Sequence, residues 1–477
     1  MPVDDVERTV AEERLWQAFP RREPVDLSEA EDRTIRASVV RALMLGAQVA
    51  DPGHVGAIIV VGAHVTGVLD VSYGDVAAPV RMARCEFDSR IEMIGTHLRE
   101  LNLEASTLRG LRAAKATLDG NLNLDAVRCT GPIELAGACI DGALVLDRAR
   151  LRAEAATLDA SRLFVGQDLR ANFGFTSDGE IVLDDAKIDG SLLMEGATIN
   201  SPVGRALTAR GLTVGAVANL NTGFTANGRV SVTSAQVGSR ISFGHAHLST
   251  PDGEALSCRH LRSNQLVLET ATRIDGEADL TYAHVGVLWD DPATWPDVLH
   301  LQGFTYDAIR SPASLEQRLT WLRREPSGYL PEAYDQLAAF YRRLGHDDQA
   351  RAVLLAGQRH RRETLKALGK VWGRLQDGVL GYGYRPWLAA LWLLAAWMAG
   401  AVFFEVVPPQ AQQAGRAGRA DLYLYTLDLL LPVADLQQEA AYRPVGAAAW
   451  GAAALVMVGW LLATTIAVGV ARVLRRP

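Results

Sequence analysis

The chain has 477 residues, of which 49% are hydrophobic, and a formal net charge of −7. That length allows more than one core, and the average combines a polar part with a strongly apolar C-terminal part. The negative balance indicates neither nucleic acid nor an anionic surface as a partner. The four cysteines lie far apart without Cys-x-x-Cys spacing, so disulfides are not expected at Cys85, Cys129, Cys139 or Cys258.

Residues 1–50 are expected to form an N-terminal helical cap. Apolar residues recur there at helical spacing, first at Val6, Val10, Leu15 and Phe19 and then at Ile35, Val39, Leu43 and Leu45. Helices of this kind would cover the exposed strand edges of a following β domain. The start, Met-Pro-Val-Asp-Asp, has neither a basic region nor an apolar core, so we expect no signal peptide to export this part.

Residues 51–310 contain a degenerate repeat. Each clear copy has an apolar residue, an Asp-Gly pair, two alternating apolar residues and a small Ala, as in 118–126, 140–149, 188–197 and 274–283. The leading apolar residues are separated by 22, 25, 23, 25 and 24 residues: Leu122, Leu144, Leu169, Leu192, Val217 and Ile241. This period predicts a parallel β-solenoid. A half-period, seen at Leu101, Leu111, Leu122, Ile133 and Leu144, indicates strands on at least two faces of each coil.

The residue types of the repeat suit the interior of a narrow coil. A strand alternates its side chains, so Leu122 and Leu124 point inward while residues such as Asp147, in the next copy, are expected to face water. We expect the glycine of each Asp-Gly pair to supply a corner with positive φ. Ala126 would then be the next inward side chain. About ten stacked coils between residues 53 and 310 would bury a continuous core.

Residues 311–378 are expected to be a helical connector. Within them the segment from Pro331 to Ala350 resembles one tetratricopeptide unit, on the matches Tyr334, Leu337, Ala338, Tyr341, Gly345 and Ala350. The peptide groove of that family requires several stacked units. A plain helical hairpin is therefore favoured over a peptide-binding role.

Residues 379–477 are expected to be a membrane domain with two transmembrane helices. Pro386 to Phe404 is uncharged, and so are the 28 residues between Arg443 and Arg472. The flanks outside the two spans are basic, at Lys366, Lys370, Arg374, Arg385, Arg472, Arg475 and Arg476. The loop between the spans combines Arg416, Arg419 and Arg443 with Asp421, Asp428, Asp435 and Glu439. This bias predicts a multi-pass protein of the cytoplasmic membrane with both termini in the cytoplasm.

Two parts of this region leave alternatives open. Residues 421–438 are apolar but too short to span, and form either an interfacial helix anchored by Tyr423 and Tyr425, which we favour, or a re-entrant hairpin. A channel would place a Gly-Tyr-Gly here, yet the motif lies at Gly381-Tyr-Gly, before the first span. The basic stretch from Arg359 to Arg374 is either an ordinary cytoplasmic flank, which we favour, or a contact with acidic headgroups.

Motifs that carry chemistry are absent from the sequence: there is no Gly-x-Gly-x-x-Gly opening a helix, no phosphate-binding Gly-Lys-Ser/Thr loop and no His-Glu-x-x-His. Three weaker groups could carry chemistry. They are Cys129 with Cys139 as a redox pair, His245 with His247 as metal ligands on one strand face, and an acidic ladder of Asp119, Asp141, Asp189 and Asp275. Ordinary core cysteines, surface histidines and turn residues explain them as well. No catalytic, cofactor-binding or metal-binding residue and no cofactor is therefore predicted.

Taken together, the motifs resemble a family of bacterial membrane proteins that join a pentapeptide-repeat-like solenoid to two C-terminal spans. The resemblance rests on the Leu-x-Leu repeats and on four segments, Tyr334 to Ala350, Gly381 to Pro386, Tyr425 to Pro432 and Gly459 to Thr465. Members are often labelled membrane-associated oxidoreductases. The resemblance implies a solenoid at the membrane, either a four-sided pentapeptide coil or a looser parallel β-helix.

The prediction is a mainly β protein that acts as a membrane-anchored cytoplasmic scaffold. Its expected partners are the lipid bilayer and a protein held on the solenoid surface, with no nucleic acid, and a homo-oligomer stays open. A membrane-associated oxidoreductase is the alternative, and a two-span pore protein is the third.

Overall fold

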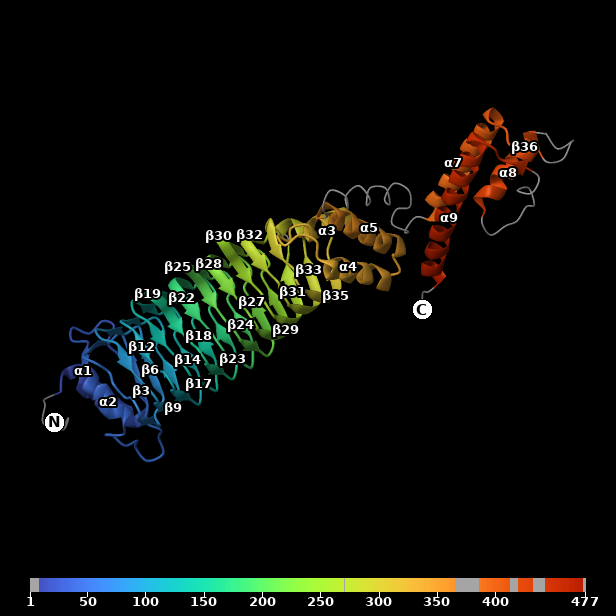
Figure 1. Cartoon of the computed structure of the whole chain (residues 1–477). Helices are drawn as coiled ribbons and strands as arrows, with labels where there is room; N and C mark the ends of the chain where they lie inside the picture. Colours follow the sequence, from blue (N-terminus) through green and yellow to red (C-terminus); the bar gives the residue numbers. More distant parts are fainter. Residues whose placement is uncertain (1–7, 270, 365–385, 412–418, 432–441, 475–477) are drawn as a thin grey trace. The chain divides into compact units, whose positions relative to one another are not determined.

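The computed structural model describes residues 8–269, 271–364, 386–411, 419–431 and 442–474. The chain divides into two compact units, residues 1–340 and 341–477. The first unit is the expected parallel β-solenoid, of about 11 turns, and Figure 1 shows its strands stacked coil upon coil from blue to yellow. Two sheets of 20 and 15 strands make up its walls.

Helices begin the solenoid, but two strands lie between them. The elements are α1 (Val10–Ala18), the short 3-10 helix η2 (Phe19–Arg21), β1 (Val25–Asp26), β2 (Thr34–Arg36) and α2 (Ala37–Met44). β1 pairs in parallel with β3 and β2 with β4, so strand pairing already starts at Val25, inside the segment expected to be helical. Leu15, Val39 and Leu43 are buried as the helical spacing indicates, whereas Val10 is 73% exposed.

A buried carboxylate ties this cap together. Glu12 closes a capping box with Thr9, and its side chain also accepts hydrogen bonds from the backbone N and guanidinium of Arg36. Burial alone would raise the pKa of Glu12, but the hydrogen bonds from Arg36 and Thr9 together hold it below the ordinary value. α1 is thereby fixed to the start of α2.

The first half of the solenoid, called here the short-strand half, consists mostly of two-residue strands. Its strands are β3 (Ile58–Val61), β4 (His64–Thr66), β5 (Asp75–Val76), β6 (Val80–Ala83), β7 (Glu86–Phe87), β8 (Ile91–Glu92), β9 (His97–Leu98), β10 (Leu101–Asn102), β11 (Thr107–Leu108), β12 (Leu111–Arg112), β13 (Thr117–Leu118), β14 (Leu122–Asn123), β15 (Arg128–Cys129), β16 (Ile133–Glu134), β17 (Cys139–Ile140) and β18 (Leu144–Val145). One coil uses β11 and β12 of the 15-stranded sheet and then β13 and β14 of the 20-stranded sheet. Four short sides per coil is the arrangement of a pentapeptide-repeat-like solenoid.

The buried positions in this half recur mostly every five residues. The uneven spacing of the apolar residues in the sequence makes this step hard to see. Two side chains two residues apart point inward on each side, and the second of each pair lies at Leu98, Leu103, Leu108, Ala113, Leu118, Leu124, Cys129, Leu135 and Ile140. Successive members are five residues apart up to Leu118, after which single inserted residues lengthen the step to six at two corners. These insertions explain why the period drifts.

The corners differ from the expected ones. Among the Asp-Gly glycines of the four clear copies, Gly276 has a positive φ, of 137°, but Gly120, Gly142 and Gly190 do not. Positive φ falls instead on residues of the other turn, such as Ala126 at 53°, where Val127 N donates to Leu124 O as in a type II turn. Ala126 is therefore a turn residue, and Val127 takes the inward position. Glycine is needed at 190 because a Cβ there would lie 2.7 Å from the carbonyl oxygen of Gln167 in the neighbouring coil.

The second half, called the long-strand half, has strands of up to 11 residues. Its strands are β19 (Arg150–Asp159), β20 (Phe164–Val165), β21 (Leu169–Arg170), β22 (Thr176–Val182), β23 (Lys187–Ile188), β24 (Leu192–Leu193), β25 (Thr198–Thr208), β26 (Thr213–Val214), β27 (Val217–Asn219), β28 (Thr225–Ser231), β29 (Gln236–Ser242), β30 (His247–Ser257), β31 (Arg262–Leu268), β32 (Arg273–Asp279), β33 (His284–Asp290), β34 (Val298–His300) and β35 (Thr305–Arg310). Two sides of a coil merge into one strand here, which leaves a broader exposed face.

Two details of the expected register are wrong. Leu192 pairs with Ala218 and not Val217, because β27 carries its buried residue one position later. Asp147 does not face water: it is 4% exposed and accepts hydrogen bonds from Arg170 Nη2 at 2.6 Å and Asn172 N at 2.8 Å. The alternation ends at this residue because it lies in the turn that follows β18.

A buried ion pair closes the C-terminal end of the solenoid. The 3-10 helix η3 (Pro292–Thr294) and helix α3 (Leu315–Leu322) lie there. Arg318 of α3 donates to both carboxylate oxygens of Asp290, at 2.7 and 2.9 Å, and Trp295 Nε1 donates to the same carboxylate. Both charged side chains are almost inaccessible, at 2% and 0% exposure, so each supplies the other's counter-charge.

Two more helices follow, α4 (Pro331–Arg343) and α5 (Asp347–Thr364). Tyr334, Leu337, Ala338 and Ala350 are buried, as expected from the tetratricopeptide-like pattern. Gly345 has φ +77° in the connecting turn, where it donates to Arg342 O. The helical hairpin is thus present, and the basic stretch beyond residue 364 lies outside the described residues.

The C-terminal helices are α7 (Pro386–Val406), α8 (Arg419–Leu430) and α9 (Ala447–Leu474), with an antiparallel pair β36 (Gln410–Ala411) and β37 (Tyr442–Arg443). Among the described residues one helix, through its segment Ala447–Thr464, is long and apolar enough to cross a membrane, and Leu391–Val406 is a shorter apolar helix. The structure therefore supports one candidate span, and two spans are not established by it.

Helix α8 falls in the segment expected to be interfacial or re-entrant. Its Tyr425 is 1% exposed and packs on Phe404 of α7 and on Tyr442, with ring centroids 5.3 and 5.0 Å apart. Tyr425 is thus a packing residue and not the outward anchor that we expected, whereas Tyr423 donates to Glu405 through its hydroxyl. Residues 432–438 and the Gly-Tyr-Gly at 381–383 lie outside the described residues.

Candidate functional site

The two cysteines weighed as a redox pair lie on different sheets. Cys129 belongs to β15 of the 15-stranded sheet and Cys139 to β17 of the 20-stranded sheet, and all four thiols are free. Burial raises the pKa of the Cys129 thiol, and burial followed by the charge of Asp141 raises that of Cys139. Burial also raises the pKa of Cys85 to about 11. Thiols of this kind are poor nucleophiles near neutral pH.

The histidine pair and the aspartate ladder are also separated by the fold. His245 lies in a turn with φ 58°, while His247 is on β30 and contacts Asp275 at 2.9 Å, so the two rings do not share a strand face. Asp119 and Asp141 follow paired strands β13 and β17, but Gly166 interrupts the row before Asp189. Asp275 is on β32 of the other sheet. Among the described residues no group of three or more His, Cys, Asp or Glu side chains is placed to hold a metal.

The structure instead reveals two parallel rows of polar side chains on the outer face of the 15-stranded sheet. In-register pairing places Arg128, Arg150, Thr176, Thr198, Thr225, His247 and Arg273 side by side in the first row. The second row, two residues further along each strand, contains Arg152, Asp178, Asn200, Asn227, Ser249 and Asp275. Neighbouring members of a row are about 4.8 Å apart because that is the strand spacing.

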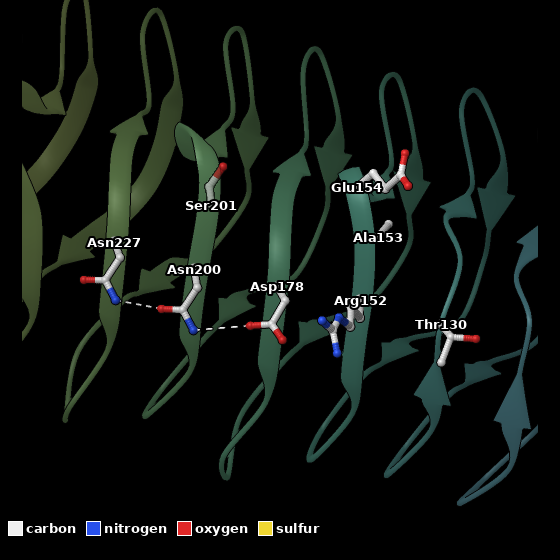
Figure 2. A pocket seen from close by; sticks show the side chains of 8 residues that line it. All are labelled: Thr130, Arg152, Ala153, Glu154, Asp178, Asn200, Ser201 and Asn227. Carbon is white, nitrogen blue, oxygen red and sulfur yellow. Dashed lines mark hydrogen bonds between the residues drawn. The ribbon is translucent and has the colours of Figure 1, made fainter.

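Side-chain amides join the middle of the second row. Asn227 Nδ2 donates to Asn200 Oδ1 at 2.6 Å, and Asn200 Nδ2 donates to Asp178 Oδ1 at 3.4 Å, as the dashed lines of Figure 2 show. These three residues are called the amide row. Each amide uses one N–H or one carbonyl lone pair in the row and keeps a further N–H for another partner. The row is a fixed series of donors and acceptors on a rigid sheet.

A groove of about 930 Å³ follows this row. It is lined by Thr130, Arg152, Ala153, Glu154, Asp178, Asn200, Ser201 and Asn227. In Figure 2 Arg152, Asp178, Asn200 and Asn227 lie along the strands, while Glu154 and Ser201 stand nearer the loops. The lining comes from four adjacent long strands and the residue after β15, so the groove runs along the axis of the solenoid.

Loops on alternate coils form the walls of the groove. The register shifts between Arg152 and Ala156 in β19, between Asn200 and Arg205 in β25, and between Ser249 and Glu254 in β30. On the coil between two such bulges a glycine lies beneath the loop. Gly179, with φ +149°, is one of these, and a Cβ there would lie 2.6 Å from Ala155 O. The bulges therefore recur every second coil.

This two-coil period was visible in the sequence but was overlooked. Ser201-Pro-Val-Gly-Arg-Ala-Leu207 and Thr250-Pro-Asp-Gly-Glu-Ala-Leu256 are the same loop, two coils apart. The intervening coils carry Asp178-Gly-Glu180, Asn227-Gly-Arg229 and Asp275-Gly-Glu277. The one-coil period alone does not predict the loops that build the groove. No protein-family profile, curated protein or solved structure matches the chain.

Proposed function

We propose that the chain is a membrane-anchored cytoplasmic scaffold whose long-strand half presents a rigid face to a protein partner. The observation that carries the proposal is the pair of in-register polar rows with a groove beside them. A partner laid along the solenoid axis would meet a donor or acceptor about every 4.8 Å. Stacked coils fix these groups without a partner, so little ordering entropy is lost on binding.

Anchorage to the membrane is supported by the apolar segment Ala447–Thr464 of α9. We propose that α7 is the second span, since its 21 residues reach about 30 Å, the thickness of the hydrocarbon core. With two spans, the basic flanks favour cytoplasmic termini. A reporter that is active only outside the cytoplasm should then be active at Gly415 and inactive at the C-terminus, and the reverse result would refute this orientation.

Photo-crosslinking in cells tests the scaffold proposal. A photoreactive amino acid at Asn227, in the groove, should form a covalent product with a defined protein, while the same residue at Lys187, on the 20-stranded sheet, should not. Both positions are on the long-strand half and partly or fully exposed, so reactivity itself is matched. Lack of a product at Asn227, Thr198 and Ser249 in a chain that is stably inserted would overturn the proposal.

The oxidoreductase alternative is distinguished by an absorption spectrum. Protein purified in detergent should show no stoichiometric flavin, haem or metal if the scaffold proposal is right. A bound redox cofactor would put the oxidoreductase first. The raised thiol pKa values already disfavour a centre that uses these cysteines as nucleophiles.

A further inference from the structure

Three arginines lie together at one end of the polar rows, and among the described residues none of them has a carboxylate partner. Arg128 and Arg150 are register neighbours on β15 and β19, and Arg152 lies two residues beyond Arg150 on the same face. All three are exposed, and within the described part of the chain none forms a side-chain hydrogen bond or an ion pair. They are called the arginine cluster.

Several exposed arginines of the solenoid are held by carboxylates on a neighbouring coil. Arg112 bonds Glu134 at 2.9 Å and approaches Glu92 at 3.5 Å, and Arg148 bonds Asp125. Arg210 is paired in the same manner with Asp184. Pairing between coils is thus common, though not general, for arginine on this solenoid. What distinguishes the cluster is that two of its arginines without carboxylate partners, Arg128 and Arg150, are register neighbours.

Placing like charges side by side on neighbouring strands destabilises a sheet. The two register neighbours Arg128 and Arg150 therefore cost stability in the isolated chain. Two carboxylates line the groove together with Arg152: Glu154 in the β19 loop, and Asp178, which already accepts a hydrogen bond from Asn200. An anionic ligand would relieve the repulsion, because guanidinium groups bind carboxylates through two parallel hydrogen bonds.

We propose that the arginine cluster and the adjoining groove bind an extended acidic segment of the protein partner. This inference rests on the proposed scaffold function and names the chemistry of the partner. Acidic side chains of the segment bind Arg128, Arg150 and Arg152, and its peptide groups bind the remaining amide groups of Asn200 and Asn227. The groove runs from β19 to β28, about 15 Å at the strand spacing, which an extended segment of about five residues covers.

The lining favours a peptide over other anions. A nucleic acid strand would stack its bases on aromatic side chains, and the groove lining contains none. Glu154 and Asp178 would repel an unbroken phosphate backbone but leave room for spaced carboxylates. A membrane surface would meet a convex basic face, whereas Arg152 of the cluster lines a hollow.

The test measures binding of defined probes to the full-length chain in detergent by fluorescence anisotropy. The first probe is a labelled peptide of about twelve alternating Glu and Ser residues, and the others are an oligothymidine of similar charge and inorganic phosphate as a competitor. The peptide should bind, and binding should weaken as salt is added. The double variant Arg128→Gln, Arg150→Gln should weaken it by at least about tenfold, the effect of one lost charge-assisted contact.

The matched control is Arg148→Gln with Arg210→Gln, which removes the same charge from two exposed arginines that have carboxylate partners. This control should bind the peptide within about twofold of the unaltered chain. Asn227→Ala should weaken binding less than the arginine variant but more than the control. Circular dichroism identifies any variant that does not fold, and in that case the single change Arg152→Gln replaces it.

Three outcomes would overturn the inference: equal losses in the cluster and control variants, tighter binding of oligothymidine than of peptide, or displacement by millimolar phosphate alone. The failure of the scaffold proposal is seen separately in the crosslinking experiment. A crosslinked partner at Asn227 that persists in the Arg128→Gln, Arg150→Gln chain would refute the acidic segment and leave the scaffold standing.

Discussion

Both halves of the solenoid are stacked coils of parallel strands, but their outer surfaces differ. In the short-strand half each coil has four short sides, corners close together, and outward side chains that pair between coils, as Arg112 does with Glu134. In the long-strand half sides merge into strands such as β25, and bulged loops stand beside the groove and its polar rows. The comparison indicates that the first half chiefly provides length and rigidity, and the second half provides the binding surface.

Substitution of the buried, inward-pointing side chains should lower the free energy of unfolding most, in both halves. Leu144 is fully buried between Leu122 and Leu169, so Leu144→Asp places a charge without a counter-charge in the coil and should cost at least about 4 kcal/mol. Thr198→Val, on the outer face of the long-strand half, should cost less than about 0.5 kcal/mol. Urea unfolding followed by circular dichroism measures both values.

The structure changes what is expected of Asp147. As a residue facing water it would tolerate Asp147→Asn silently, but its carboxylate is buried and accepts from Arg170 and Asn172. The change should now cost about 1 to 2 kcal/mol, since a hydrogen bond to a charged group is weakened and the backbone bond is retained.

Equal losses of stability for Leu144→Asp and Thr198→Val would contradict the division into an essential interior and a tolerant outer face.

The end of the long-strand half depends on a single ion pair. Arg318→Met leaves the Asp290 carboxylate buried without its cation and should cost about 3 kcal/mol. Asp290→Asn combined with Arg318→Met should recover a large part of that loss, because no charge then stays buried. Unfolding in urea checks this, and a double variant that is no more stable than the single one would show that the bond geometry, and not the charge, holds the cap.

Substitutions at the corners of the coils test how closely neighbouring coils approach each other. Gly190→Ala brings a Cβ to 2.7 Å from a backbone oxygen of the next coil, so two coils must separate, at a cost of about 2 kcal/mol. Ala126→Gly, at the turn with φ 53°, should change stability by less than about 1 kcal/mol, because relief of strain and greater freedom of the unfolded chain oppose each other. A silent Gly190→Ala would mean that the corners are looser than described.

These corners also show what the sequence does and does not reveal. The period of Leu122, Leu144 and Leu169 follows from burial alone, and the structure confirms the solenoid and the half-period. A single residue inserted at a corner changes neither the composition nor the alternation within the strand that follows. The displacement of the buried position from Val217 to Ala218 therefore has no signal in the sequence. The role of Gly190 depends on Gln167 in another coil, a contact that local propensity does not contain.

The groove was predictable only in part. The Ser-Pro-x-Gly and Thr-Pro-x-Gly loops at 201 and 250 are a sequence signal for the bulges. Predicting that Arg128 adjoins Arg150, and that Asn200 adjoins Asn227, requires the strand register to be known to the exact residue. Shifts within β19 and β25 alter that register. The absence of carboxylate partners around the cluster is a property of three coils together and cannot be read from any one of them.

The smallest expected effect is the pH dependence of stability that comes from one histidine in the short-strand half and one aspartate in the long-strand half. His97, exposed in the short-strand half, contacts Asp119 at 2.8 Å and Asp75 at 3.2 Å, and these hydrogen bonds, first that of Asp119, raise its pKa above the ordinary value. In the long-strand half, hydrogen bonds from His247 and then from Arg273 lower the pKa of Asp275. A raised histidine pKa adds stability below its unfolded pKa of about 6.5, and that contribution is lost as the pH rises through the folded pKa.

The lowered carboxyl pKa has the opposite sign: the stability that Asp275 contributes is present above its unfolded pKa and is lost as the pH falls through the folded value. The contribution of His97 is therefore lost toward alkaline pH and that of Asp275 toward acid. NMR titration of His97 should give a midpoint above about 6.5 that falls in Asp119→Asn, because the hydrogen bond that raises the pKa most is weakened. A midpoint unchanged by Asp119→Asn would show that the bridge between coils is not formed.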